Sequence, residues 1–284
     1  MKNGMKTGVL LAAMAGLIMF AGSMFGQGGL VLAFIFSLVM IGGSYWFSDK
    51  LAIRAARAVE ATEHQHPRYY QVMRELTQLA DMPMPRLYIS PEMQPNAFAT
   101  GRGPNHAAVA VTEGLLQALT WDEIRGVLAH ELAHIKNRDI LIGSVAATIA
   151  STISFVANMA MWGAMFGGGR DDDDNNPIAA LAFALLAPIA ASLIQMAISR
   201  SREYQADRTA ARLIGDGEPL ARALEKLHGY SVRVPSHVQP AQASHYIINP
   251  LAGRQMSFSK MFSTHPPAEE RVRLLRSGEW RGLL

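Results

Sequence analysis

The segment GVLAHELAHIKNRD, residues 126–139, carries two histidines four positions apart and a glutamate directly after the first. On a helix, residues at i and i+4 project from the same side, one turn apart, so His130 and His134 are able to share one metal ion. Two imidazoles at this spacing hold zinc at ~2.0–2.1 Å each. Glu131 is then placed to act on a water molecule at the metal. The spacing predicts metal-assisted hydrolysis, and a helix with two surface histidines is the alternative.

The residues around this segment predict a helix with a defined start. Thr120 is a favourable N-cap, and Glu123, three residues later, completes a capping box. Apolar residues then recur at helical spacing and form a stripe next to the two histidines. This stripe consists of Ile124, Val127, Leu128, Leu132 and Ile135.

A catalytic zinc ion takes three protein ligands and leaves its fourth position to water. The chain has no cysteine, so the third ligand must be His, Asp or Glu. The apolar segments 140–166 and 177–198 are joined by a short loop, and an antiparallel pair would return the chain to the metal. Glu203 is therefore the predicted third ligand. Asp207, one turn further, is predicted to hydrogen-bond a ligand imidazole, and surface helical ion pairs are the alternative.

The composition predicts a membrane protein with a large polar part. Half of the 284 residues are hydrophobic and only 17% are charged, against about 25% in an average soluble domain. Four uncharged segments approach or exceed the ~20 residues of a membrane helix. They are residues 8–25, 29–47, 140–166 and 177–198. A cleaved signal peptide is the alternative for the first of them.

The distribution of lysine and arginine around these segments predicts cytoplasmic termini and cytoplasmic charged regions. The expected fold is mainly α with a small β-sheet. It would consist of four transmembrane helices and a gluzincin-like (HExxH) cytoplasmic metalloprotease domain that is formed by two separate parts of the chain. The expected divisions are a hairpin at 1–47, the first protease part at 48–139, a second hairpin at 140–198 and the second protease part at 199–284. The net charge of +3 comes without a basic run interleaved with aromatics, which argues against nucleic-acid binding.

A β-hairpin is predicted just before the helix that carries the histidines. Residues 96–100 and 107–112 are typical of two short strands joined by a glycine-containing loop, and 86–90 of a third strand. An exposed strand edge is able to bind an extended substrate through backbone hydrogen bonds, with Asn96 or Ala97 on that edge. A purely structural hairpin is the alternative.

Three further segments complete the expected organisation. Residues 51–80 are predicted to be helical, and residues 267–276 to form a C-terminal amphipathic helix. Residues 231–262 contain several prolines and serines, and are expected to be a connector or a lid near the site.

Several motifs together resemble a known family. The chain resembles the HtpX-type membrane zinc endopeptidases of bacteria, which are relatives of the CAAX prenyl proteases. The resemblance rests on the motif HELAH, the two apolar segments that follow it and the motif SREYQAD. NAFATG at 96–101 and STHPPAEER at 263–271 match as well, so the resemblance covers nearly the whole chain.

The resemblance implies one zinc ion per chain, held by His130, His134 and Glu203, with Glu131 catalytic. It also places His265 near the site, as a candidate donor to the developing oxyanion. The alternative is a capping or packing residue, because His265 precedes two prolines and a predicted helix. It further implies degradation of misfolded or damaged membrane proteins from the cytoplasmic side of the bacterial inner membrane, within quality control and the stress response.

Two other function classes compete with a protease. A membrane scaffold or adaptor with a structural metal site would favour four protein ligands rather than three beside an attacking glutamate. A metal transporter would require ionisable residues within its spans. The predicted spans hold only Asn158 and Gln195 as strongly polar side chains, which argues against transport.

Overall fold

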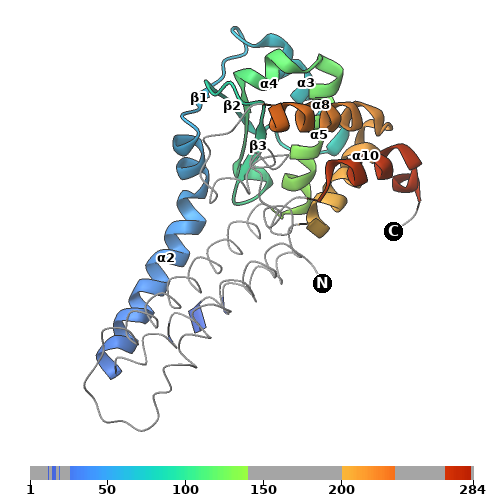
Figure 1. Cartoon of the computed structure of the whole chain (residues 1–284). Helices are drawn as coiled ribbons and strands as arrows, with labels where there is room; N and C mark the ends of the chain where they lie inside the picture. Colours follow the sequence, from blue (N-terminus) through green and yellow to red (C-terminus); the bar gives the residue numbers. More distant parts are fainter. Residues whose placement is uncertain are drawn as a thin grey trace. The chain divides into compact units, whose positions relative to one another are not determined.

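The chain forms two compact units in the computed structural model (Figure 1). One unit comprises Met1–Tyr45 and Ile142–Ala197, and the other comprises Trp46–Leu141 and Ile198–Leu284. The structure describes residues 12, 15, 16, 19, 26–139, 200–233 and 266–282. Every functional side chain considered below lies in the second unit.

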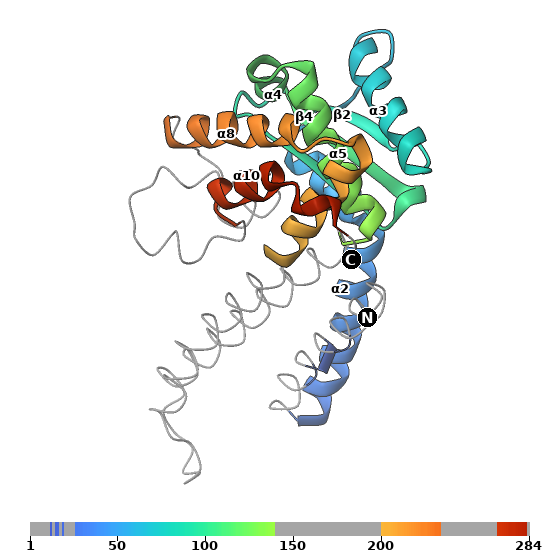
Figure 2. The ribbon, with the colours of Figure 1, turned by 90° about the vertical axis from the view of Figure 1, so that its right-hand side faces the viewer.

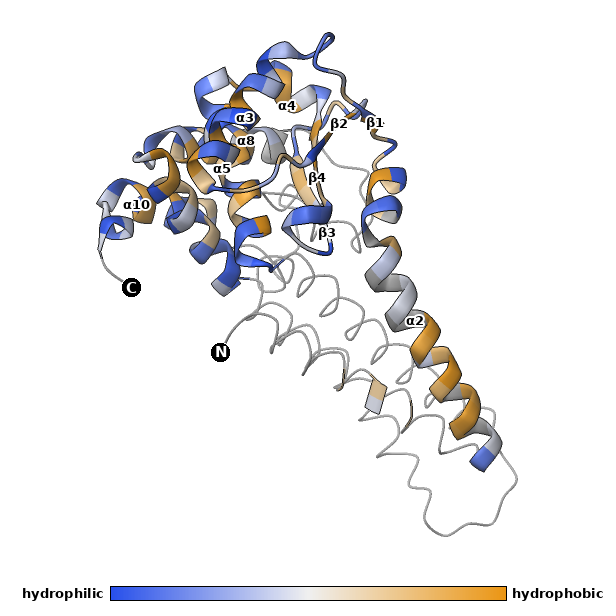
Figure 3. Cartoon of the chain, turned by 180° about the vertical axis from the view of Figure 1, so that it is seen from behind, coloured by the Kyte–Doolittle hydropathy of each residue, from blue (hydrophilic) through white to orange (hydrophobic). Residues whose placement is uncertain are grey.

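Helix α2 (Gly26–Ala55) is most apolar in its N-terminal half and becomes mixed toward its C-terminal end (Figure 3). Many of its large hydrophobic side chains, from Val31 to Phe47, are exposed. Within the described ranges, however, no helix combines the length and apolar character needed to cross a membrane, so the predicted span at 29–47 is not confirmed. The predicted spans at 140–166 and 177–198, and nearly all of 8–25, lie outside the described residues.

A four-stranded mixed sheet forms the centre of the second unit, in the order β1-β2-β4-β3. Strand β2 is parallel to β4, whereas β1 and β3 run antiparallel to their neighbours. Among the described residues, β3 therefore pairs on one side only. The strands are β1 (Val59–Glu60), β2 (Arg86–Ser90), β3 (Ala97–Gly101) and β4 (Ala107–Thr112). The three strands expected from the sequence are confirmed.

The two faces of the sheet contact different elements. Leu87, Val109 and Val111 join the main apolar core with helix residues, whereas Tyr88 and Phe98 pack beside the C-terminal end of α2. This alternation follows from the two-residue period of a strand. Figure 2 shows α8 and α10 side by side. The helices are α3 (Pro67–Ala80), α4 (Glu113–Ala118), α5 (Trp121–Asn137), α8 (Glu218–Arg233) and α10 (Ala268–Ser277).

Helix α5 begins and packs as the sequence predicts. Thr120 and Glu123 form the full capping box, with both side chains bonded to backbone N–H groups. Further along, Gly126 lies against the backbone of α8: a Cβ there would come within 2.5 Å of the Leu220 nitrogen. The close crossing holds α5 between the sheet and α8, which gives the histidine-bearing helix a rigid setting.

The prediction that residues 51–80 are helical is confirmed for 51–55 and 67–80 and is wrong between 56 and 66. Helix α2 ends at Ala55, and Arg57 takes a left-handed conformation with φ 50°. The chain then pairs with β2 as the short strand β1, because β2 offers it an open edge. The next helix starts only at Pro67, a residue suited to the first helical position. The helix predicted at 267–276 is confirmed as α10.

Candidate metal centre

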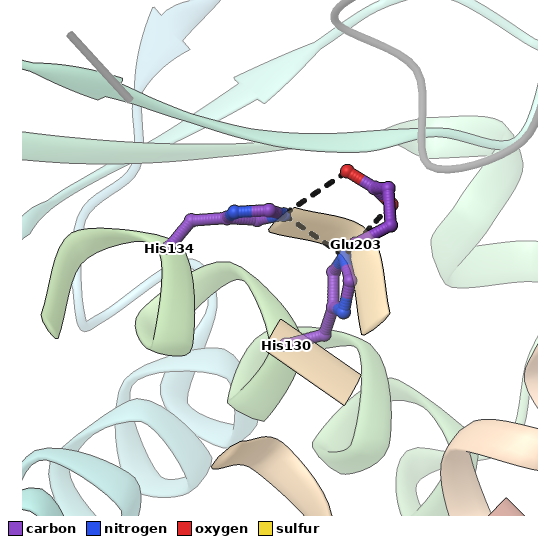
Figure 4. Close-up of side chains that lie close together, drawn as sticks. All are labelled: His130, His134 and Glu203. Carbon is purple, nitrogen blue, oxygen red and sulfur yellow. Dashed lines mark hydrogen bonds and ion pairs between the residues drawn. The ribbon is translucent and has the colours of Figure 1, made fainter. Parts of the chain in front are cut away.

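Three side chains that are distant in sequence converge at one point (Figure 4). The Nε2 atoms of His130 and His134 lie 3.1 Å apart. The Glu203 carboxylate faces both, with Oε2 3.6 Å from Nε2 of His130 and Oε1 3.5 Å from Nε2 of His134. His130 and His134 come from α5, and Glu203 comes from the helical residues 200–214. Burial of His130, which is 1% exposed, excludes the alternative of two surface histidines.

This group of donors fits a zinc ion. Tetrahedral zinc with bonds of about 2.0–2.1 Å separates its ligand atoms by about 3.3 Å. The two Nε2 atoms lie 3.1 Å apart, and each lies 3.5–3.6 Å from one of the two oxygens of Glu203, so the donors are close to the spacing that the ion requires. Two neutral imidazoles and a carboxylate form a ligand set of catalytic zinc sites. Within the described residues this is the one group of three or more such side chains able to hold a metal ion.

His130 is supported by a buried charged network. Its Nδ1 lies 2.9 Å from Oδ1 of Asp207. Arg271, from α10, donates to both oxygens of Asp207 at 2.8 and 2.7 Å and lies 3.3 Å from Oε2 of Glu203. Arg271 is only 1% exposed. The Arg271 guanidinium contacts both carboxylates. It therefore fixes the position of the proposed ligand Glu203 relative to Asp207, which orients the His130 imidazole.

His134 is supported by a local turn. Its Nδ1 lies 3.0 Å from Oδ1 of Asp139, which is buried. Arg138 ends α5 in a left-handed conformation with φ 55°, and the N–H of Asp139 donates to the carbonyl of His134 at 3.2 Å. The reversal brings Asp139 back beside the histidine five residues earlier. With both Nδ1 atoms beside carboxylates, both Nε2 atoms face the metal position.

Glu131 lies beside this group and is buried. Burial is the main reason that the pKa of its carboxyl group is raised, and the Glu203 carboxylate adds to this effect. The two imidazoles and a hydrogen bond from the Ala99 backbone lower it in part. A carboxylate with a raised pKa is a stronger proton acceptor near neutral pH.

Strand β3 runs beside Glu131 through Ala99. The N–H of Thr112 donates to the carbonyl of Asn96 at 2.9 Å, so the backbone of Asn96 faces β4. In an antiparallel pair the direction alternates along the strand, so the backbone groups of Ala97 and Ala99 face the other edge. The predicted strand is confirmed, and the substrate-binding roles of Asn96 and Ala97 stay predictions.

Two residues of the site were not foreseen, and one candidate is not located. Arg271 is adjacent to Val272 and one turn before Leu275, both buried, so the apolar periodicity of α10 indicated that it faces inward. Asp139 carried no comparable signal, because an arginine rarely marks a left-handed helix end. His265 lies outside the described residues, as does nearly all of 231–262.

The fold and the site define a helix-based metallopeptidase with its residues on both sides of an apolar insertion. The model of peptidase family M48 matches residues 63–279. The chain belongs to this family, and within it to the HtpX-type proteases.

The relatives support this assignment along the whole chain. A protease HtpX homologue of Syntrophobacter fumaroxidans is 53% identical over 283 residues, which cover 98% of this chain and 100% of that protein. One from Pelotomaculum thermopropionicum is 51% identical, covering 97% and 99%. The crystal structure of Ste24p from S. mikatae shares the fold, with a TM-score of 0.52 and 21% identity, over 96% of this chain and 65% of that one.

Proposed function

We propose that the chain is an integral-membrane, zinc-dependent endopeptidase that hydrolyses internal peptide bonds of misfolded or damaged proteins. The observation that carries this proposal is the donor triangle of His130, His134 and Glu203 with Glu131 buried beside it. Three ligands and an adjacent carboxylate are what a catalytic zinc site needs, whereas a structural site would close with a fourth ligand.

The ion would polarise the scissile carbonyl and increase the acidity of a water molecule. The chain's own residues supply the rest. Glu131 accepts the proton of the attacking water and passes it to the leaving amine. The hydrogen bond from Ala99 keeps the Glu131 carboxylate in one orientation. His265 is the proposed donor to the developing oxyanion.

We place the substrate along the outer edge of β3. An extended peptide pairs there through backbone hydrogen bonds, so recognition depends little on side-chain identity. Ala97 contributes through its backbone, which faces that edge, and Asn96 directly precedes the strand. Such recognition suits unfolded segments, because a folded protein does not offer an unpaired extended backbone.

The proposed location is the bacterial inner membrane, with four spans, both termini in the cytoplasm and the site on the cytoplasmic side. The support comes from the sequence: four apolar segments with flanking basic residues. A site in the cytoplasm next to the bilayer would meet damaged membrane proteins first, which makes quality control the proposed role.

The test uses the purified full chain with unfolded casein as the probe. The parent is expected to contain one zinc ion and to cleave casein. Glu131→Gln is expected to keep the zinc and to lose cleavage by at least ~100-fold, because a general base contributes 10²–10⁴-fold. Glu113→Gln makes the same chemical change at an exposed glutamate and is expected to behave as the parent. Cleavage retained by Glu131→Gln, or a zinc-loaded parent that never cleaves, would overturn the proposal.

A further inference from the structure

A surface of aromatic and basic side chains lies where α2 enters the second unit. Trp46 and Phe47 are 56% and 53% exposed. The guanidinium of Arg102, in the turn after β3, lies 4.5 Å from the centre of the Trp46 ring. Lys50, one turn along α2, holds its ammonium 5.8 Å from the centre of the Phe47 ring. We call these four residues, together with Arg54, the basic-aromatic surface.

Among the described residues, no acidic side chain neutralises the cations of this surface. Within the described part of the chain, Lys50, Arg54 and Arg102 make no ion pair. The acid in the same stretch of α2, Asp49, instead pairs with Arg86 at 2.6 Å. Lys50 and Arg102 thus stand beside two exposed aromatic rings, and Arg54 lies one turn beyond Lys50 on α2. With no acidic partner among the described residues, these cations are complementary to a negatively charged surface.

The neighbouring sequence of α2 indicates which negative surface this is. Trp46 and Phe47 lie on α2 about two turns beyond a run of exposed apolar side chains from Val31 to Val39. Tryptophan at the end of an apolar stretch, followed by lysine and arginine, is the arrangement found at the level of lipid headgroups. Near an anionic leaflet each such cation adds to the electrostatic attraction between the protein and the lipid surface.

We propose that the basic-aromatic surface binds the headgroups of anionic phospholipids, with Lys50, Arg54 and Arg102 contacting phosphate and Trp46 and Phe47 at the level of the glycerol. This inference rests on the proposed membrane location. Arg102 directly follows Gly101, the last residue of β3. A lipid bound at Arg102 therefore lies at the end of the strand whose Ala99 contacts Glu131.

The test measures lipid preference directly. The full chain in detergent micelles is given equimolar dioleoyl phosphatidylglycerol and dioleoyl phosphatidylcholine, and the bound lipids are counted by native mass spectrometry. The parent is expected to prefer phosphatidylglycerol. Lys50→Gln and Arg102→Gln are each expected to lower that preference about fivefold, the equivalent of about 1 kcal/mol per charge, and Arg102→Lys is expected to restore it. Arg68→Gln removes an exposed charge from α3 and is the matched control.

Further measurements keep the outcomes distinct. Zinc content reports whether each variant is folded, and Lys50→Gln leaves the Arg102–Trp46 contact in place in case Arg102→Gln does not fold. Equal binding of both lipids by a parent that resists carbonate extraction from vesicles would overturn this inference alone. Extraction by carbonate would overturn the membrane location and this inference together. A preference abolished by excess inorganic phosphate would show a free-anion site and would also overturn it.

Discussion

The two histidines of α5 are held by different means. His130 depends on Asp207 and Arg271, which come from two other helices and reach the histidine only in the folded protein. His134 depends on Asp139, five residues away, placed by a single left-handed turn. Loss of a support that comes from distant helices should lower both metal affinity and the free energy of unfolding. Loss of the support that a local turn provides should act mainly on metal affinity, although Arg202 of another helix also lies within the electrostatic influence of Asp139.

Arg271→Gln should break the support of His130 with the largest effect. The change leaves Asp207 and Glu203 as buried carboxylates without their shared cation, and breaking a buried ion pair in this way costs about 3–5 kcal/mol. We expect the free energy of unfolding, measured with urea on the full chain in micelles, to fall by that amount.

Arg276→Gln is the matched control one turn along α10. Arg276 contacts both Glu218 and Glu225, but these contacts are exposed, and exposed pairs contribute little. We expect its unfolding curve to stay close to that of the parent. If the two variants were equally unstable, the burial of Arg271 would not be the cause.

The paired variants Asp207→Asn and Asp139→Asn sharpen the contrast. Each removes the negative charge beside one Nδ1 atom, and loss of such a partner lowers metal affinity about 10–100-fold. Asp207→Asn should also reduce stability, since it leaves the Arg271 guanidinium buried with less counter-charge. Asp139→Asn should weaken zinc binding, measured by chelator competition, with a smaller loss of stability in urea unfolding, because Asp139 lacks the bidentate pairing that Asp207 has with Arg271. Equal losses of stability in both variants would remove the distinction between the two supports.

The same contrast explains how much could be predicted from the sequence. The capping box of α5 and the strand over 107–112 depend on neighbouring residues, and local patterns report them. Glu203 could be predicted as a ligand because the apolar segments 140–166 and 177–198 are expected to pair, and this pairing returns the chain to the two histidines. The apolar periodicity of α10 indicates only that Arg271 faces inward. Its role in the site was missed because its partners lie 64 and 68 positions earlier in the chain, and local periodicity does not identify such partners.

The local turn was missed for a different reason. A left-handed residue at a helix end is usually glycine, and here it is Arg138. The short strand β1 is a similar case, since Val59 and Glu60 are extended only because β2 offers an edge. Both depend on contacts that outweigh the intrinsic preference of the residue.

Arg138→Val tests the local support without touching either carboxylate. A β-branched residue is strained in the left-handed region by about 1–2 kcal/mol, so the turn should rearrange and carry Asp139 away from His134. We expect a several-fold loss of zinc affinity in chelator competition. Arg138→Gly permits the same φ without strain and should retain the affinity of the parent. Parent-like affinity in Arg138→Val would mean that the turn does not position Asp139.

The smallest expected effect concerns the other end of α5. Burial raises the pKa of Glu123, but the Lys226 ammonium at 2.8 Å and the Thr120 backbone outweigh it, so the pKa is lowered overall. A lowered pKa in the folded state means that the stabilisation is present above the unfolded value and is lost as pH falls through the folded one. Glu123→Gln should therefore lose about 1 kcal/mol at pH 7, the typical contribution of a helix cap. The difference in free energy of unfolding between this variant and the parent, measured with urea, should become smaller at acid pH. The control Glu113→Gln should have the same free energy of unfolding as the parent at both pH values. A difference that stayed constant would mean that the capping bond, rather than the ionised carboxylate, holds this end of the helix.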